Sequence, residues 1–325
     1  MKAWIGSIVV CLLVSSSSYA MGGIPPATGE VAVAPSISFV RSIGGAGSGN
    51  GQFLYPRDVC VGAYGDLSTG IGNIFVADTG NNRIQVFDSG GDFMFQFGSF
   101  GSDAGKFNSP TNVAVDFNYR IYVVDKENSR VQKFDVRGNY LSEFGSFGTD
   151  SGQFSDPCGI GVDSWGRIFV ADTGNNRVQK FDETGSYLDS IGAFGWGAGF
   201  FDAPKDVAID IDKNVYVADT KNDRIQKLDE YGKPILSFGK PGGGDGEFHD
   251  PSGIAVDEKY IYVSDTGNGR VQVFNRNGVF LAKFGKTGSN NGEFNGPTGI
   301  SVGKPGQLFV ADTNNHRIQE FRVSF

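Results

Sequence analysis

Short apolar runs alternate with turns rich in glycine and asparagine along most of the chain. One such pattern, FVADTGNNRIQVFD, begins at Phe75 and recurs in six copies, the others beginning at Tyr122, Phe169, Tyr216, Tyr262 and Phe309. Each copy contains an apolar run that ends in aspartate, a turn tetrad, and a second run that opens with arginine. The aspartates are 46 or 47 residues apart. A period of this length with several strands per repeat is typical of a β-propeller.

A second pattern, G-x-F-x-x-P, precedes each copy and leads into another apolar run. Its prolines are Pro56, Pro110, Pro157, Pro204, Pro251 and Pro297. In the fifth repeat the apolar runs predict strand a over 253–257, b over 261–265, c over 270–275 and d over 280–285. The tetrad between b and c predicts a tight turn. Four antiparallel strands make one blade, so we expect an all-β, six-bladed propeller.

The strand count predicts how the ring closes. Five d strands lie between the six a-b-c sets, and the sequence ends at Phe325 just after the sixth strand c. A run equivalent to strand d, ISFVRSIG, stands instead at residues 37–44. We expect this N-terminal strand to complete the last blade, which removes an open sheet edge. The propeller would then occupy residues 37–325.

The first twenty residues predict a cleavable secretory signal. Lys2 supplies a positive charge, residues 8–14 (IVVCLLV) form a short apolar core, and residues 18–20 (SYA) form a small-residue cleavage site. No lipobox surrounds Cys11. Residues 21–36 predict a flexible leader. We therefore expect a secreted or periplasmic protein with no membrane span, folded as a monomeric propeller.

The net charge narrows the choice of partners, and the cysteine positions bear on disulfide formation. The net charge is −8 with a sequence pI near 4.9, and removing residues 1–20 deletes one lysine and makes the charge −9. Nucleic acid is a poor partner for such a chain, because phosphate binding needs a basic face. Cys60 and Cys158 fall in blades that are not neighbours, so we expect two buried thiols rather than a disulfide.

The core of each repeat, V-x-D-x-x-N-x-R-[IV]-Q with its upstream proline, resembles the NHL repeat. The resemblance covers residues 37–325. It implies the six-bladed propeller. Known NHL propellers include RNA-binding domains, extracellular sensor domains of bacterial kinases and the lyase that completes peptide amidation. The resemblance therefore implies a fold more narrowly than a function.

Residues present in every repeat are expected to serve the scaffold, since a ring needs the same joint in each blade. Aspartate ends strand b, arginine opens strand c, and a glutamine follows two residues later. Buried polar groups must pair, so we predict a structural clasp of Asp, Arg and Gln in each blade. Its charged pairs are Asp78 with Arg83, Asp125 with Arg130, Asp172 with Arg177, Asp219 with Arg224, Asp265 with Arg270 and Asp312 with Arg317.

Function is expected where the copies differ, on the face that carries the d–a and b–c turns, here called the top face. Two residues after the proline, blades 3, 5 and 6 have glycine, whereas the others have Asp58, Asn112 and Asp206. Two carboxylates and an amide around a channel mouth suit a hard cation such as Ca²⁺. The alternative is that the carboxylates cap backbone amides, with Arg57 and Lys205 neutralising them. We expect no other cofactor.

The d–a loops that follow blades 1, 2 and 3 carry aromatic residues at matching positions, namely Phe100, Phe147 and Phe194, with Trp196 near the last. Exposed aromatic side chains mark contact surfaces for proteins or carbohydrates. We call these four residues the aromatic arc and predict a binding surface there. The alternative is that each ring packs over the neighbouring blade. The a–b loop of blade 1, residues 62–73, is also longer than its counterparts.

The sequence favours binding over catalysis. The amidating lyases place zinc-binding histidines directly after the repeat prolines, where this chain has Arg57, Thr111, Cys158, Lys205, Ser252 and Thr298. His249 and His316 cannot make a three-histidine zinc site. We predict a secreted non-catalytic module that binds a protein or glycan through its top face. The alternative is a metal-dependent hydrolase or lyase with its site at the channel mouth.

Overall fold

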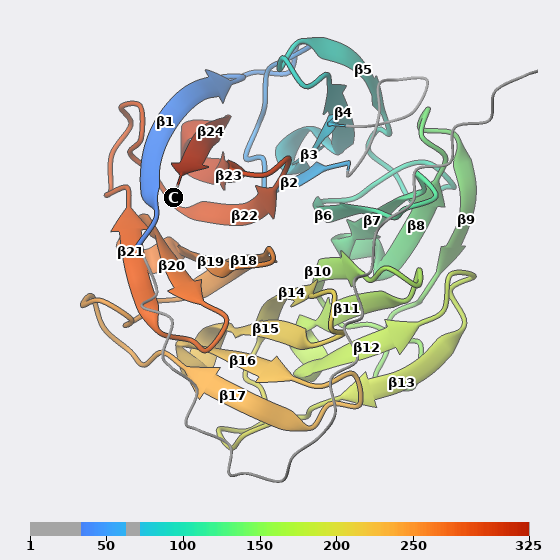
Figure 1. Cartoon of the computed structure of the whole chain (residues 1–325). Helices are drawn as coiled ribbons and strands as arrows, with labels where there is room; N and C mark the ends of the chain where they lie inside the picture. The colour runs from blue at the N-terminus through green and yellow to red at the C-terminus, as the bar shows by residue number, and fades with distance from the viewer. Residues whose placement is uncertain (1–33, 63–71, 325) are drawn as a thin grey trace, which may run out of the picture. The chain divides into compact units, whose positions relative to one another are not determined.

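Six four-stranded antiparallel sheets surround a central channel, as the sequence predicted (Figure 1). The computed structural model describes residues 34–62 and 72–324. The predicted signal, all but the last residues of the predicted leader, and most of the long a–b loop of blade 1 lie outside the described residues. Within the described ranges, no helix is long and apolar enough to cross a membrane.

The strands follow the repeat, from the innermost to the outermost in each blade. Blade 1 comprises β2 (Asp58–Val61), β3 (Ile74–Asp78), β4 (Arg83–Phe87) and β5 (Phe93–Phe97). Blade 2 comprises β6 (Pro110–Val115), β7 (Ile121–Asp125), β8 (Arg130–Phe134) and β9 (Tyr140–Phe144). Blade 3 comprises β10 (Pro157–Val162), β11 (Ile168–Asp172), β12 (Arg177–Phe181) and β13 (Tyr187–Ile191).

The second half of the ring repeats this order. Blade 4 comprises β14 (Pro204–Ile209), β15 (Val215–Asp219), β16 (Arg224–Leu228) and β17 (Pro234–Phe238). Blade 5 comprises β18 (Pro251–Val256), β19 (Tyr260–Asp265), β20 (Arg270–Asn275) and β21 (Phe280–Phe284). Blade 6 comprises β22 (Pro297–Val302), β23 (Gln307–Asp312), β24 (Arg317–Ser324) and β1 (Ser36–Ile43).

The b–c connection is a tight turn in every blade, as the tetrad predicted, and takes the form of a short 3-10 turn. These turns are η1 (Thr79–Asn81), η2 (Lys126–Asn128), η3 (Thr173–Asn175), η4 (Thr220–Asn222), η5 (Thr266–Asn268) and η6 (Thr313–Asn315). The residue after each turn is left-handed; in blade 1 it is Asn82, at φ 54°. Asparagine tolerates this conformation better than most residues.

The hydrophobic core lies between neighbouring blades. The phenylalanine of G-x-F-x-x-P is fully buried in all six copies, as its predicted role in the core requires. Phe107 illustrates its position, because its ring centroid lies 5.6 Å from that of Phe134 and 6.3 Å from that of Phe97 in the preceding blade. Gly98 has φ 88°, and a Cβ there would collide with the Phe107 ring. Each blade therefore packs against the next through an aromatic side chain. The position beside that ring has room only for glycine.

The N-terminal strand closes the ring. Strand β1 pairs antiparallel with β24 from Ser36 opposite Ser324 to Ile43 opposite Ile318. A bulge interrupts the pairing between Phe39 and Arg41. Figure 1 shows both ends of the described propeller in this one blade. The predicted closure is thus confirmed, and the last blade depends on residues nearly three hundred positions apart.

Removing β1 is predicted to destabilise the propeller. A chain that starts at residue 45 leaves the outer edge of β24 unpaired, and exposed strand edges promote association between molecules. We expect a lower urea midpoint and higher oligomers in light scattering. A chain that starts at residue 34 retains β1 and serves as the control. Equal midpoints and monomeric behaviour of both chains would show that β1 is dispensable.

The repeated aspartate lies at the centre of a buried hydrogen-bond network in each blade. In blade 3, Oδ2 of Asp172 accepts hydrogen bonds from Nε of Arg177 at 2.8 Å and Nε2 of Gln179 at 3.0 Å. The backbone N–H of Ser155 donates to Oδ1 at 2.8 Å, and Asn175 also donates to this carboxylate. The Asn of the turn tetrad therefore belongs to the clasp together with the predicted Asp, Arg and Gln. Its presence in all six tetrads could have indicated this role.

The same side chains bind the loop that enters the blade. Arg177 donates through Nη2 to the carbonyl oxygens of Asp150 and Gln153, at 2.8 and 3.0 Å. Asn175 donates to the carbonyl of Gly148 at 2.9 Å. All six aspartates are fully buried, and the six Arg–Asp distances lie between 2.6 and 2.8 Å. The clasp therefore joins strands b and c to the d–a loop.

Asp172→Asn is predicted to lower the free energy of unfolding by about 3–5 kcal/mol, because it removes the buried carboxylate that pairs with the half-buried Arg177. The change is measured by urea denaturation. Asp189→Asn on the exposed strand β13 is the matched control, with an expected change within about 0.5 kcal/mol. Equal losses in both variants would argue against the clasp as a stabilising element.

Candidate functional site

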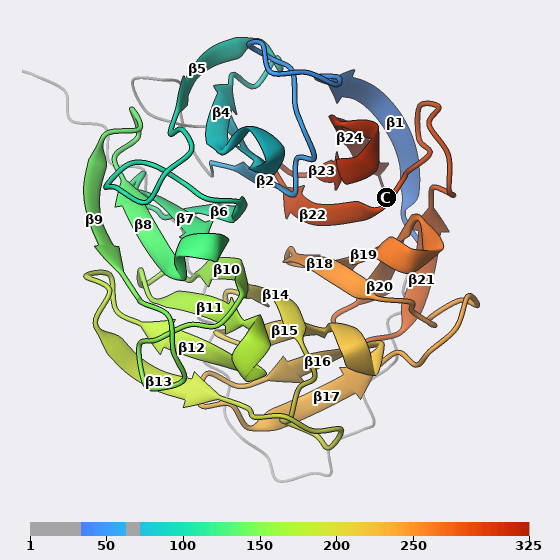
Figure 2. The same ribbon diagram turned by 180° about the vertical axis from the view of Figure 1, so that it is seen from behind.

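The top face carries both regions that the sequence singled out. Figure 2 is seen from this side, with the short 3-10 turns in front of the strands. At its centre the channel opens into a cavity of about 200 Å³. Its lining includes the six residues that directly follow the repeat prolines, one from each blade: Arg57, Thr111, Cys158, Lys205, Ser252 and Thr298. Below it, the six inner strands line the channel with mainly apolar side chains.

The two aspartates of the mouth, Asp58 and Asp206, are buried and bind main-chain amides. Asp58 Oδ2 accepts a hydrogen bond from the N–H of Val113 in blade 2 at 3.0 Å. Asp206 Oδ2 accepts one from Ile254 in blade 5 at 2.9 Å, and its Oδ1 accepts one from Val207. Each carboxylate therefore caps an amide of the following blade and links neighbouring inner strands.

In this layer a glycine precedes each aspartate around the ring, because the aspartate needs the space. A Cβ added to Gly299 would collide with Asp58, and a Cβ added to Gly159 would collide with Asp206. Both glycines belong to the blade that precedes the aspartate in the ring. The variation in this layer is thus at least partly a packing requirement, which no single repeat reveals.

The mouth holds its carboxyl groups in an environment that favours the neutral form. Burial raises the pKa of Asp206 to about 7. Burial also raises the pKa of Asp58 well above its ordinary value, and the negative charge of Asp206 raises it further. The N–H donors of Val113 and Ile254 oppose these shifts but do not cancel them. Asp206 therefore changes its charge near neutral pH, and Asp58 keeps its proton above the ordinary range of an aspartate.

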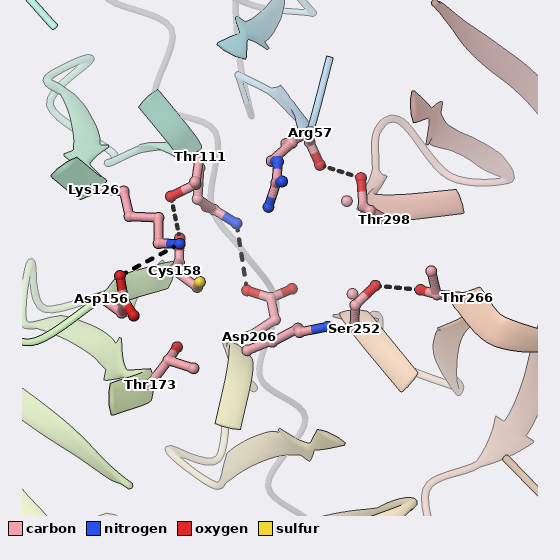
Figure 3. Close-up of a pocket in the computed structure, with 14 residues that line it drawn as sticks. Arg57, Thr111, Lys126, Asp156, Cys158, Thr173, Asp206, Ser252, Thr266 and Thr298 are labelled. Atoms are coloured by element: carbon pink, nitrogen blue, oxygen red, sulfur yellow. Dashed lines mark hydrogen bonds and ion pairs between the residues drawn. The ribbon is translucent and has the colours of Figure 1, made fainter. Parts of the chain in front are cut away.

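The proposed cation ligands lie close together but are engaged with protein atoms. Asn112 approaches Asp206 through Nδ2, at 3.5 Å from Oδ1 (Figure 3). Within residues 34–62 and 72–324, no group of three His, Cys, Asp or Glu side chains could hold a metal ion. A Ca²⁺ ion would have to displace main-chain hydrogen bonds and deprotonate both carboxyls. The Ca²⁺ site stays a prediction, and the amide-capping alternative describes the contacts that are present.

Other side chains of the mouth differ from expectation. Neither Arg57 nor Lys205 forms an ion pair with Asp58 or Asp206 in the described part of the chain, so the expected neutralisation is absent. Cys60 and Cys158 are unpaired, as predicted, but only half-buried. Figure 3 shows the Cys158 sulfur directed into the cavity.

The aromatic arc is exposed to solvent. The exposed fractions are 70% for Phe100, 79% for Phe147, 58% for Phe194 and 73% for Trp196. The rings of Phe194 and Trp196 contact each other edge to face, with centroids 5.8 Å apart. Packing over the neighbouring blade, the alternative considered above, does not agree with these exposures.

The loops that carry the arc have the same backbone pairing as the loops that lack it. The backbone of Phe100 forms an isolated β-bridge with that of Phe107. Phe147 and Phe154 pair in the same way, as do Phe194 and Phe201. The other three loops make the same bridge from Ala46, Pro241 and Thr287. An aromatic side chain is therefore not needed to close the loop. The fold does not require phenylalanine at these three positions.

The two histidines lie apart from any shared site. His316 follows η6, and its Nδ1 accepts a hydrogen bond from the N–H of Tyr55 at 3.0 Å. His249 is exposed in the loop that enters blade 5. Their positions agree with the absence of a three-histidine arrangement in the sequence.

Comparison with known proteins identifies the family. The sequence profile of the family described as 6-bladed beta-propeller matches residues 67–145 and 149–237, more than half of the chain. The NHL repeat profile matches residues 248–274 and 294–321. The chain belongs to the 6-bladed beta-propeller family and contains NHL repeats. This membership confirms the resemblance inferred from the repeat core.

Individual relatives of this propeller cover different shares of it. Protein brain tumor of Drosophila melanogaster is 46% identical over 65 residues, which is 20% of this chain and 6% of that protein. The match thus spans well under a tenth of the relative. Its repeats are similar to those of this chain, but the comparison extends to little else.

Two solved structures share the fold across nearly the whole propeller. An auxiliary nutrient binding protein from Bacteroides ovatus has a TM-score of 0.63 at 12% identity, covering 90% of this chain and 78% of its own. A catalytically inactive virginiamycin B lyase from Staphylococcus aureus, solved with quinupristin, has a TM-score of 0.58 at 12% identity, covering 89% and 99%. At such identities the likeness concerns the fold alone.

Titration of Asp206 is predicted to make this propeller less stable as the pH rises. The folded protein keeps a proton on Asp206 up to about pH 7, whereas an unfolded aspartate loses it near pH 4. The free energy of unfolding should therefore fall across that window, by about 1.4 kcal/mol per pH unit for one proton.

Urea denaturation between pH 5 and pH 8 measures this dependence. Asp206→Asn should make the slope less steep, whatever its effect on stability at any one pH. Asp212→Asn, at an exposed position in an a–b turn, should leave the slope unchanged. A slope that Asp206→Asn does not alter would mean that Asp206 ionises in its ordinary range.

Proposed function

We propose that this propeller is a secreted, non-catalytic interaction module that binds a protein or glycan through the aromatic arc of its top face. The observation that carries the proposal is the exposure of four large aromatic side chains on three successive loops. Aromatic residues supply much of the binding energy in protein interfaces and stack on sugar rings. Leaving them in water has no benefit for the fold.

The loop backbones hold the arc in place before any partner arrives. Arg224 donates hydrogen bonds to the carbonyls of Trp196 and Phe200, at 2.6 and 2.9 Å. Asn128 and Asn175 donate to the carbonyls that follow Phe100 and Phe147, each at 2.9 Å. Side chains on a pre-organised backbone lose less conformational freedom on binding. The clasp thus supports the arc as a contact surface.

Two further observations support this proposal. One structural neighbour is described as an auxiliary nutrient binding protein, so a propeller of this shape is compatible with a binding role. Residues 1–20 have the pattern of a secretory signal, and we propose that the partner is met in the periplasm or outside the cell. The acidic charge disfavours a nucleic-acid partner.

The alternative is a metal-dependent hydrolase or lyase at the channel mouth. The observation that favours it is the pKa of Asp206, near 7, a value suited to general acid–base catalysis. Asp58→Asn/Asp206→Asn separates the two proposals. A binding module would keep its affinity for the partner, whereas an enzyme of this kind would lose its activity.

Removing two rings of the arc is predicted to weaken partner binding. Residues 21–325 are immobilised and exposed to the secreted and envelope fraction of the source organism and, separately, to a glycan array. We expect a saturable protein or glycan ligand, identified by mass spectrometry or by array position. Phe147→Ala/Phe194→Ala should weaken its binding at least tenfold, because both rings are removed from the contact surface.

The control is Phe117→Ala, which removes an exposed phenylalanine from an a–b turn on the opposite face. It should bind as the unaltered protein does. A ligand that binds the double variant undiminished, or the absence of any saturable ligand on both supports, would count against the arc as the binding surface.

A further inference from the structure

Two cations at the channel mouth form no ion pair. Arg57 and Lys205 directly follow the repeat prolines of blades 1 and 4, and both line the 200 Å³ cavity. Among the described residues, neither side chain forms an ion pair or donates a hydrogen bond. By contrast, all six clasp arginines are paired with buried aspartates, and Lys126, which also lines the cavity, is paired with Asp156. Among the described residues that line the cavity, Arg57 and Lys205 are therefore the cations without an ion pair.

Burial removes part of the hydration of the Lys205 ammonium group. Its side chain is partly buried, and that burial lowers the pKa of its ammonium group. The negative charge of Asp250 opposes this shift, whereas the positive charges of Lys221 and Arg57 add to it. A partly buried charge without an ion-pair partner is unfavourable, so an anion that enters the cavity would stabilise the ammonium group.

The two aspartates of the mouth do not already supply the counter-charge for Arg57 and Lys205. Asp58 and Asp206 are engaged with the amides of Val113, Val207 and Ile254. They lie one residue further along strand a than the two cations, and burial raises the pKa of both carboxyl groups, that of Asp206 to about 7. The cations are thus available to a ligand.

The remaining wall of the mouth holds the Lys126–Asp156 ion pair and hydroxyl oxygens whose protons are already committed. Thr111 donates to the carbonyl of Cys158 at 2.9 Å, and Thr298 donates to that of Arg57 at 2.6 Å. Thr173 and Thr266 donate to the carbonyls of the next repeat proline, at 2.7 and 2.6 Å. Each hydroxyl keeps a lone pair for a donor. The wall therefore suits a ligand that carries hydroxyl groups of its own.

The cavity is small compared with sites for drug-sized ligands, which occupy roughly 300–1,000 Å³. We propose that the top mouth binds a small polyhydroxylated carboxylate of monosaccharide size, with its carboxylate drawn to Arg57 and Lys205 and its hydroxyls donating to the threonine wall. This is a second site, separate from the aromatic arc and independent of its function. No reaction is implied.

Isothermal titration calorimetry of the full-length mature chain, residues 21–325, tests the site with sodium glucuronate and sodium gluconate. Glucose is the uncharged comparison, and inorganic phosphate is the anion without hydroxyl-bearing carbon. We expect at least one of the two carboxylates to bind, with glucose and phosphate each at least tenfold weaker. Arg57→Gln and Lys205→Gln should each weaken that binding at least tenfold.

Lys233→Gln, at an exposed c–d turn, loses the same charge on the other face and should bind as the unaltered protein does. Phe147→Ala/Phe194→Ala should also retain carboxylate binding, which separates this site from the aromatic arc. Thermal denaturation of each variant verifies its fold. The proposal is overturned if neither carboxylate binds, if glucose or phosphate binds equally well, or if folded Arg57→Gln and Lys205→Gln bind undiminished.

Discussion

The buried aspartate at the end of strand b is the constraint on which the rest of the propeller depends. A carboxylate withdrawn from water is unfavourable unless hydrogen bonds and a counter-charge surround it. Asp172 receives both from Arg177, Gln179, Asn175 and a backbone amide. Removing any one of these donors would leave the others around an under-satisfied charge. This explains why the whole set recurs in every blade with so little change.

The clasp also fixes the loops on which the ring could acquire a function. Its arginine and asparagine bind carbonyls of the d–a loop, so that loop has the same backbone pairing whether it carries Phe147 or Thr287. The side chain at this position is then free to vary without a penalty in folding. Sequence variation at this loop position is tolerated because the clasp maintains the backbone beneath it.

The architecture could be predicted from the sequence because its determinants are local and repeated. The aspartates recur every 46 or 47 residues, as do the prolines after a first interval that the long a–b loop of blade 1 lengthens, and even the closure by residues 37–44 follows from a strand count. The mouth could not be predicted in the same way. Whether Arg57 reaches Asp206, and why Gly159 lies beside Asp206, depends on contacts across blades that no repeat contains. The tight turns were predicted from the composition of the tetrads, but that composition does not specify the 3-10 form.

The mouth and the arc represent two ways in which a symmetric ring gains a specific surface. In the arc, an added aromatic side chain changes what the loop presents while the blade stays as it was. In the mouth, six equivalent positions converge on one axis, so Arg57 and Lys205 on opposite blades act on the same small volume. A substitution at the periphery therefore alters one blade's contacts, whereas a substitution at the axis alters the environment of all six. Charge placed at the axis has the larger effect on the field in the channel. Burial raises the pKa of both Asp58 and Asp206, and the convergence adds the negative charge of Asp206 to the shift at Asp58.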